Sequence, residues 1–326
     1  MLTNTTAPGE FNLGIDIPPT AVELPIPFDF HVHTCMSDGD PDQTPDEVCR
    51  AAGDAGIRRL SITDHDAMLT DRQRRELAKK HRIDLVAGCE ISCTWKVPGT
   101  GKKKVIHLGR HWGSAETPLI REVLRHNQSQ DFEGYTKEML SRLLKHSLNP
   151  SHEGVDRSYE MLRAANPDSL HLGKRAVAKL LVDTDCVASK DEVMARYLGA
   201  DGDRLAYVPT EEVMDFVPFE QAMAAANENA LSTLNHLFYY GLEADERDAL
   251  LQDFKDLGGQ ALEVVYTRYA HLKQVKLFGF CHKYGLLANA GSDRHDASRR
   301  FMGGPPELYT LLQIRRRQLF GDEGAE

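Results

Sequence analysis

The chain has 326 residues, a formal net charge of −10, and 41% hydrophobic and 27% charged residues. This length allows a large buried core, in one domain or in a domain with an insertion, and the composition is ordinary for a globular protein. The acidic balance argues against a surface for long nucleic acids, and no apolar stretch approaches the roughly 18 residues that span a bilayer. We therefore expect neither long nucleic acid nor a membrane as a partner.

Residues 1–27 contain five prolines and no clear periodicity, and we expect them to form an N-terminal extension. An alternation of strands and helices follows. Apolar runs predict seven strands, at 28–33, 60–63, 84–87, 104–109, 230–235, 261–265 and 286–290. Helical patterns separate them, for example after an N-cap at Thr44 and at 71–81, 246–257 and 271–284. This order predicts an α/β fold with a parallel sheet or barrel.

The stretch 118–226 interrupts the alternation. It contains helical patterns and no strand pattern of comparable quality, with helices expected at 119–125, 135–146, 158–164, 174–181 and 190–197. We expect an inserted helical cap subdomain at 118–226, between two parts of a barrel at 28–117 and 227–326.

Six of the seven predicted strands place a His, Asp or Glu within or just beyond their C-terminal ends. Because βα-barrel enzymes assemble their active sites at this edge, we expect these side chains to share one site. His31 and His33 alternate on a strand, so both imidazoles face the same side. These residue types are ligands of Mn, Fe and Zn. The candidate metal ligands are His31, His33, Asp38, His65, Glu90, His107, His236, Asp293 and His295.

Six motifs resemble those of the PHP (polymerase and histidinol phosphatase) superfamily: H-V-H-T-C-M-S-D-G (31–39), I-T-D-H-D (62–66), A-G-C-E-I-S (87–92), I-H-L-G (106–109), N-H (235–236) and A-G-S-D-R-H (290–295). The resemblance extends from about residue 28 to about residue 300. R-Y-L-G (196–199) and A-Y-V-P (206–209) further resemble the TrpH-like branch. This resemblance implies a distorted seven-stranded (β/α)7 barrel with an inserted helical subdomain.

The resemblance also implies three divalent ions per chain, which are Mn, Fe or Zn. One ion is expected on His31, His33, Glu90 and Asp293, a second on Glu90, His107 and His236, and a third on Asp38, His65 and His295. The implied reaction is hydrolysis of a phosphoester by a hydroxide shared between two ions. The implied substrate is small and phosphorylated, either a nucleoside 3′,5′-bisphosphate or a short 5′-phosphorylated oligoribonucleotide.

Three cationic side chains are candidates to hold an outer phosphate, namely Lys174, Arg175 and Arg294. The segment G-K-R-A-V-A (173–178) departs from the family pattern G-R-P-H-I-A, and N-H-L (235–237) departs from A-H-P. Lys174 keeps the positive charge but not the bidentate geometry of arginine. The reaction type is therefore better specified than the substrate.

The carboxyl groups of Asp64 and Asp66 are candidates either to protonate the leaving group or to orient the metal-bound imidazoles. Arg268 and His271 follow a predicted strand at the same edge and are candidate substrate contacts.

Three other functions fit the sequence less well. A histidinol-phosphate-type phosphatase fits the R-Y-L-G and A-Y-V-P segments poorly. A non-catalytic PHP partner or scaffold module would be expected to have lost metal ligands. An amidohydrolase often uses a bridging lysine, whereas Glu90 suits that role here. Six scattered cysteines favour free thiols and a reducing cytoplasm, and the oligomeric state is left open.

Overall fold

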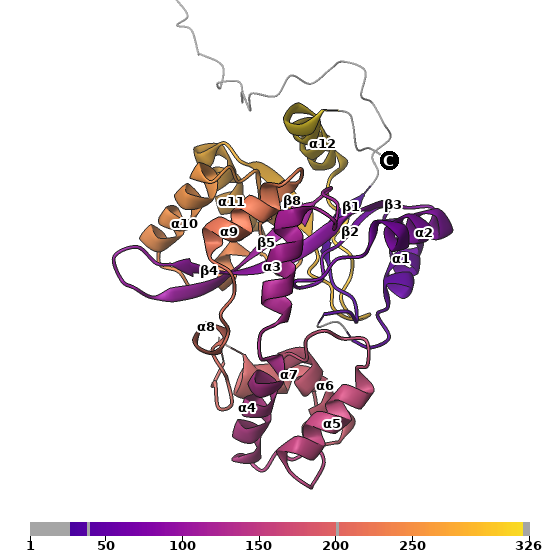
Figure 1. Cartoon of the computed structure of the whole chain (residues 1–326), viewed down its shortest axis with the longest axis vertical. Coiled ribbons are helices and arrows are strands. Elements are labelled where there is room, and N and C mark those ends of the chain that lie inside the picture. Colours follow the sequence, from indigo (N-terminus) through magenta and orange to yellow (C-terminus); the bar gives the residue numbers. More distant parts are fainter. Residues whose placement is uncertain (1–26, 38–39, 200–201, 322–326) are drawn as a thin grey trace, which may run out of the picture.

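The computed structural model describes residues 27–37, 40–199 and 202–321. The expected N-terminal extension, apart from Pro27, and the candidate ligand Asp38 lie outside the described residues. Figure 1 shows strands and their covering helices in one part of the molecule and a group of helices, α4 to α7, in the other.

A parallel three-stranded sheet begins the fold. It contains β1 (Phe28–Val32), β2 (Arg59–Ile62) and β3 (Asp84–Val86), in that order. The connecting helices are α1 (Pro45–Asp54) and α2 (Asp71–His81). The Thr44 side chain accepts a hydrogen bond from the Glu47 amide at 3.2 Å, which confirms the expected N-cap.

A mixed five-stranded sheet follows, in the order β4 (Gly88–Lys96), β5 (Lys103–His111), β6 (Leu231–Leu234), β7 (Ala261–Tyr266) and β8 (Leu287–Gly291). β5 runs antiparallel to both β4 and β6, whereas β6, β7 and β8 are parallel.

The structure corrects the sequence prediction in two respects. The described residues form eight strands, not seven, because the chain leaves β3 and enters β4 across Ala87 alone. The run from Leu85 to Cys89 is interrupted only by Gly88, and this single glycine does not by itself predict a second strand after it. Gly88 fits here because a Cβ would lie 2.1 Å from the Ser61 Oγ. The expected parallel pairing holds for β1–β3 and β6–β8 but is wrong for β5, which runs antiparallel to β4 and β6.

Backbone contacts beyond the strand ends connect the two sheets. His65, after β2, forms a parallel bridge with Glu90 of β4, and Val32 of β1 forms one with Arg294, after β8. The His33 amide donates to the Arg294 carbonyl at 2.8 Å. The end of β2 therefore lies beside the first part of β4, and the ends of β1 and β8 lie side by side.

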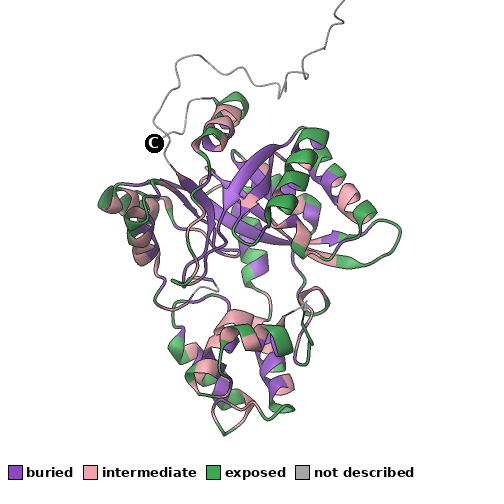
Figure 2. Ribbon diagram, turned by 180° about the vertical axis from the view of Figure 1, so that it is seen from behind, coloured by how far each residue is buried: buried purple, intermediate pink, exposed green. Residues whose placement is uncertain are grey.

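Helices cover the outer surface of the mixed sheet. α3 (Pro118–Gln128), α9 (Phe219–Asn227), α10 (Ala244–Asp256) and α11 (His271–Tyr284) share one hydrophobic cluster with its strands. α12 (Pro306–Phe320) packs against β8 and the start of β1. Figure 2 shows buried strands beneath helices whose outer faces are exposed.

The remaining helices have a hydrophobic cluster of their own. They are α4 (Phe132–Leu144), α5 (Val155–Ala165), α6 (Lys174–Asp183), α7 (Lys190–Val193), η1 (Met194–Leu198) and α8 (Thr210–Val213). We call this part, residues 132–213, the helical lobe. α3 and α9 fall within the expected insertion at 118–226 but pack on the sheet. Among the described helices, none is both long and apolar enough to cross a membrane.

A buried arginine ties β5 to the segments that enter and leave the helical lobe. The Arg110 side chain is fully buried and donates to the carbonyls of Gly113 at 2.6 Å, Ala225 at 3.1 Å and Glu228 at 3.0 Å. Buried polar groups that lose a partner cost about 1–3 kcal/mol each.

We therefore expect Arg110→Met to lower the free energy of unfolding by about 2–4 kcal/mol, because three carbonyls lose a donor. Urea unfolding followed by circular dichroism measures this change. Lys103→Met, at an exposed position of the same strand, is the matched control and should change stability little. Equal stability of the two variants would contradict the structural role of Arg110.

Candidate metal centre

Eight of the nine candidate ligands converge on one place. They come from the ends of β1, β2, β6 and β8 and from within β4 and β5. Their ligand atoms form four overlapping groups. Within each group, one ligand atom from each residue lies within 4.8 Å of the others. The groups are His33, His65 and His295; His31, Glu90 and His236; His31, His33 and Asp293; and His65, Glu90 and His107.

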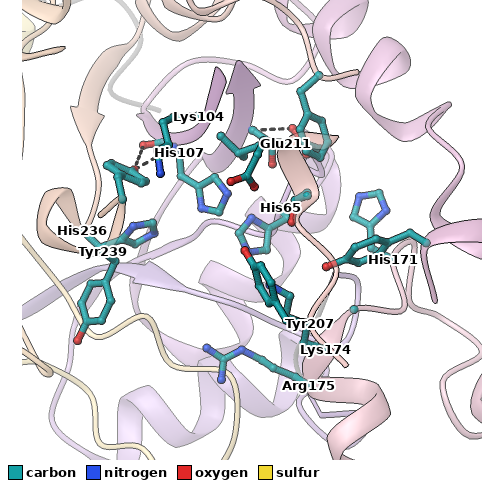
Figure 3. A pocket seen from close by; sticks show the side chains of 18 of the residues that line it. His65, Lys104, His107, His171, Lys174, Arg175, Tyr207, Glu211, His236 and Tyr239 are labelled. Atoms are coloured by element: carbon teal, nitrogen blue, oxygen red, sulfur yellow. Dashed lines mark hydrogen bonds between the residues drawn. The ribbon is translucent and has the colours of Figure 1, made fainter. Parts of the chain in front are cut away.

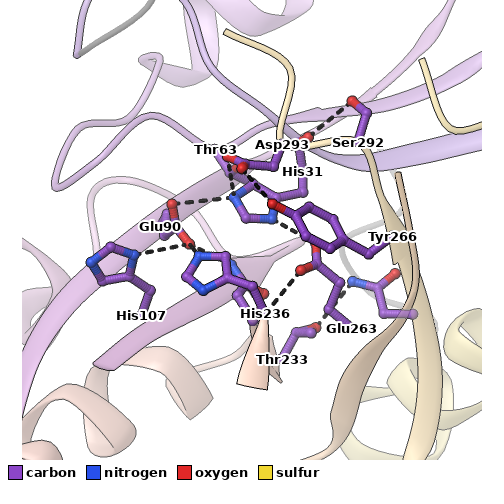
Figure 4. Close-up of polar contacts among 12 residues, drawn as sticks. His31, Thr63, Glu90, His107, Thr233, His236, Glu263, Tyr266, Ser292 and Asp293 are labelled. Atoms are coloured by element: carbon purple, nitrogen blue, oxygen red, sulfur yellow. Dashed lines mark hydrogen bonds and ion pairs between the residues drawn. The ribbon is translucent and has the colours of Figure 1, made fainter. Parts of the chain in front are cut away.

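Glu90 lies at the middle of this convergence, and its two oxygens face different imidazoles (Figure 4). Its Oε2 lies 3.2 Å from the nearest ring nitrogen of each of three histidines: His31, His33 and His65. Its Oε1 lies 3.1 Å from His236 Nε2 and 3.5 Å from His107 Nδ1. A carboxylate placed in this way can bridge two cations.

The charge of Glu90 is stabilised by its neighbours. Its carboxyl is fully buried, and burial alone would raise its pKa. The imidazoles of His31, His65 and His107 oppose this effect and hold the pKa of Glu90 well below its usual range. The group is therefore ionised, as a metal ligand must be.

The tautomer of His31 is set by a second carboxylate. His31 Nδ1 lies 2.6 Å from Glu263 Oε1, so this nitrogen carries the proton. His31 Nε2 faces Glu90 Oε2 at 3.2 Å and His33 Nε2 at 3.1 Å. Despite burial, the two carboxylates raise the pKa of His31, so without an ion Nε2 also carries a proton, and with an ion bound it is the nitrogen that would offer its lone pair. A carboxylate behind a ligating histidine is the usual support of a metal site, because it fixes the ring and raises its basicity.

Asp293 brings the loop after β8 to the same place. Its Oδ1 lies 3.4 Å from His33 Nε2 and 3.3 Å from His295 Nδ1. Its Oδ2 accepts hydrogen bonds from the Tyr266 hydroxyl at 2.7 Å and from Arg299 Nη1 at 3.1 Å. The His295 ring stacks on that of His33 with centroids 4.1 Å apart.

The polar atoms of the site fit divalent cations. Glu90 Oε2, His107 Nδ1 and His236 Nδ1 are buried and make no hydrogen bond, although the first two lie within ion-pair distance of neighbouring groups. Buried polar atoms are normally hydrogen-bonded, so such a cluster indicates a ligand that satisfies them. Imidazole and carboxylate donors together suit Zn, Mn or Fe.

Sequence reasoning missed Glu263, because the strand that carries it was expected to supply no ligand. Besides orienting His31, Glu263 accepts the His236 amide at 2.9 Å. Gly291 leaves room for this pair, since a Cβ there would lie 2.3 Å from His31 Cβ and 2.6 Å from Glu263 Oε1. The available signal was a single acidic residue inside the apolar strand A-L-E-V-V-Y.

Asp64 and Asp66 hold loops around the site. Asp64 accepts the Thr34 amide, the Thr34 hydroxyl and the Ser37 hydroxyl, each at 2.7 Å. Asp66 accepts Asn127 Nδ2 at 2.7 Å and the Ser92 amide at 2.9 Å. Burial raises the pKa of both carboxyl groups. Asp66 also lines the pocket described next, whereas Asp64 lies outside its lining.

A cavity of about 600 Å³ opens from the metal centre towards the helical lobe. His65, His107 and His236 line it on the sheet side. The helical lobe contributes Lys174, Arg175 and Tyr207, which Figure 3 shows, and also Arg204 and Phe132. The Lys174 Nζ lies 4.3 Å from the centre of the Tyr207 ring, and burial lowers the pKa of Lys174 to about 8.

Three candidate substrate contacts lie elsewhere. The Arg294 guanidinium is buried and donates to Gln43 Oε1 and to the Arg299 carbonyl, so it packs the loop after β8 and does not line the pocket. Arg268 and His271 are exposed and also lie outside the pocket lining. The sequence placed all three near the correct strand ends but could not show where their side chains point.

Comparisons with known proteins agree with this arrangement. The sequence model of the PHP domain matches residues 29–290. The 5′-3′ exoribonuclease of Salmonella typhimurium is 27% identical over 271 residues, 82% of this chain and 85% of that protein. The 3′,5′-nucleoside bisphosphate phosphatase of Chromobacterium violaceum is 25% identical over 270 residues, 82% and 86% of the two chains.

A solved structure described as an amidohydrolase from Chromobacterium violaceum has the same fold. It superposes with a TM-score of 0.72 at 22% sequence identity, and the match covers 85% of this chain and 90% of that one.

The contact between Glu263 and His31 leads to a test of metal binding. We expect Glu263→Gln to lower the affinity for the ions by about 10- to 100-fold, because His31 loses its carboxylate partner while the side-chain size is kept. Elemental analysis after graded chelator treatment measures this. Asp253→Asn, whose carboxylate accepts the Trp95 indole at 2.8 Å outside the site, is the control. Equal metal retention in both variants would remove Glu263 from the support of the site.

Proposed function

The chain belongs to the PHP domain family, and from this premise we propose that it is a metal-dependent phosphoesterase. Its proposed substrates are nucleoside 3′,5′-bisphosphates and short 5′-phosphorylated oligoribonucleotides. The observation that carries the proposal is the position of Glu90 between two groups of histidines, next to a cavity lined on its other side by cations. The named activities of the relatives support it.

Three divalent ions, Mn, Fe or Zn, are proposed to occupy the centre. His31, His33, Glu90 and Asp293 would hold the first, and Glu90, His107 and His236 the second. His65 and His295 would hold the third together with Asp38, which lies outside the described residues. When bound, the ions supply charge stabilisation for the phosphate and lower the pKa of water towards about 7.

The reaction is a hydrolysis in which water adds its hydroxyl group to phosphorus. The phosphorus–oxygen ester bond breaks, and the released alcohol oxygen takes up a proton. Lys174, Arg175 and Arg204 line the side of the cavity formed by the helical lobe and are placed to bind a second phosphate of the substrate. Asp64 and Asp66 act as positioning residues, because they hold the loops that follow β1 and β2.

A bisphosphate and an oligoribonucleotide can undergo the same chemistry. In each, a 3′-linked phosphate is the reacting group and a terminal 5′-phosphate is the second anion. The O3′–phosphorus bond breaks and leaves a nucleoside 5′-phosphate. Two phosphates on one nucleoside thus match a site in which a metal centre and a group of cations share one cavity.

We also propose that the two sheets close into a distorted barrel and that the helical lobe forms a cap above it. This cap is narrower than the expected 118–226, because α3 and α9 pack on the sheet. The backbone bridges from His65 to Glu90 and from Val32 to Arg294 support closure of the two sheets. The separate hydrophobic cluster of the helical lobe supports a cap. The six free cysteines support a reducing cytoplasm as the place of action.

The substrate proposal is tested by phosphate release and product analysis on metal-loaded protein. Adenosine 3′,5′-bisphosphate and a short 5′-phosphorylated RNA should be hydrolysed, with histidinol phosphate as the comparison substrate. We expect His236→Asn to reduce turnover at least about a hundredfold, because one ion loses a ligand. If histidinol phosphate were the only substrate hydrolysed, the nucleotide substrates would be wrong, but the proposed phosphoesterase reaction would stand.

Lys174 leads to a pH-dependent effect on substrate affinity. Burial lowers the pKa of this ammonium group from 10.5 to about 8, so its charge is present below pH 8 and lost above it. We expect the KM for the bisphosphate to rise severalfold between about pH 7 and about pH 9.5, because a phosphate contact loses its charge. Lys174→Arg should keep a flat KM over this range. Parallel KM profiles of the two proteins would show that Lys174 does not bind the substrate anion.

A further inference from the structure

An aromatic ring stands at the edge of the pocket beside the candidate ligand His236. Tyr239 ends the short helix η2 (Leu237–Tyr239), lines the pocket and is 40% exposed. Its ring lies 6.4 Å from that of His236, with the ring planes at 83°. Figure 3 shows Tyr239 apart from Lys174 and Tyr207, which belong to the helical lobe. The pocket therefore extends from the metal centre towards two different groups of side chains.

The Tyr239 ring is held in place by packing. It lies nearly parallel to the ring of Tyr269, with centroids 5.8 Å apart and planes at 10°. Tyr269 is buried, and its hydroxyl accepts the Phe238 amide at 3.1 Å. The edge of Tyr266 contacts Tyr239 at 5.9 Å. An aromatic ring that is ordered before binding loses little conformational entropy when a ligand stacks on it.

A cation lies next to this ring. Lys273 Nζ, in the first turn of α11, lies 5.7 Å from the centre of the Tyr239 ring and 5.6 Å from that of Tyr269. α11 contains no acidic residue, and exposed Arg268 and His271 precede and begin this helix. A positively charged edge is unusual in a chain of net charge −10. We call Tyr239, Tyr269 and Lys273 the aromatic ledge.

An ammonium group beside an exposed aromatic ring is suited to one nucleotide unit, whose base stacks on the ring and whose phosphate pairs with the cation. In the proposed function, the cations of the helical lobe bind the terminal phosphate of the first nucleotide, so Lys273 is left for another phosphate. Of the aromatic ledge, Tyr239 lines the pocket beside His236, whereas Tyr269 and Lys273 lie behind it outside the lining. The ledge therefore offers a second contact next to the metal centre and separate from the cations of the helical lobe.

We propose that the aromatic ledge binds the second nucleotide of a 5′-phosphorylated oligoribonucleotide, with its base on Tyr239 and its following phosphate near Lys273. This inference rests on the proposed function and adds a specificity determinant to it. A nucleoside 3′,5′-bisphosphate ends at the reacting phosphate and does not reach the ledge. The ledge therefore sets the preference for oligonucleotides over bisphosphates.

The test compares kcat/KM for a 5′-phosphorylated RNA trinucleotide with that for adenosine 3′,5′-bisphosphate. In Tyr239→Ala, the ratio of the two values should fall roughly tenfold or more, because stacking on one ring is lost. Tyr239→Phe should restore the ratio, since stacking requires the ring and not the hydroxyl. Lys273→Ala should lower the ratio severalfold and weaken its salt dependence. Phe278→Ala is the control for loss of an exposed aromatic ring. Phe278 is 44% exposed and lies on α11, the helix of Lys273, outside the pocket lining.

Each outcome separates this inference from the proposed function. An unchanged ratio in Tyr239→Ala overturns the ledge, whether the two kcat/KM values stay the same or fall by the same factor. Wild-type protein that hydrolyses the bisphosphate but not the trinucleotide also overturns the ledge and leaves the phosphoesterase standing. Wild-type protein that carries its ions but hydrolyses neither substrate overturns the proposed function and the ledge with it.

Discussion

The burial of the Glu90 carboxylate is the constraint on which the site depends. A buried carboxylate is costly unless positive charge or hydrogen-bond donors surround it. Five imidazoles from β1, β2, β5 and β6 face its two oxygens, and Asn235 donates to Oε1 at 2.8 Å. Each element that contributes one of these groups must end close to β4. The arrangement of the strand ends and the charge of Glu90 therefore depend on each other.

Other buried carboxylates hold the loops around the site by accepting hydrogen bonds from loop amides. Asp29 accepts the amides of His31, Ser292 and Met302, and burial raises its pKa to about 6. Asp64 does the same for the loop after β1, and Glu263 supports His31 and the His236 backbone. Buried carboxylates with such donors stay satisfied only in one loop conformation. Several acidic residues outside the candidate ligand set are thus needed to place the candidate ligands.

The helical lobe completes the site from the opposite side. It touches the loop after β1 directly, where the Leu170 amide donates to the Met36 carbonyl at 2.8 Å and Lys190 pairs with Asp40 at 2.9 Å. Because α3 and α9 pack on the sheet, the two connections to the lobe start from rigid positions. Lys174 and Arg175 can therefore face the metal centre, although they lie more than 65 residues beyond Glu90 and His107 in the sequence.

The sequence by itself determined the α/β class, the helical insertion as a pattern, and eight candidate ligands that the structure brings together, because His, Asp and Glu at strand ends carry a strong local signal. It could not determine that β4 is a separate strand, that β5 runs antiparallel, or that Glu263 supports His31. Those features depend on contacts between residues distant in sequence, and a single acidic residue in an apolar strand does not reveal its partner. Side-chain direction was likewise decided only by tertiary packing, which turned Arg294 into the loop after β8 and brought Tyr239 to the edge of the pocket.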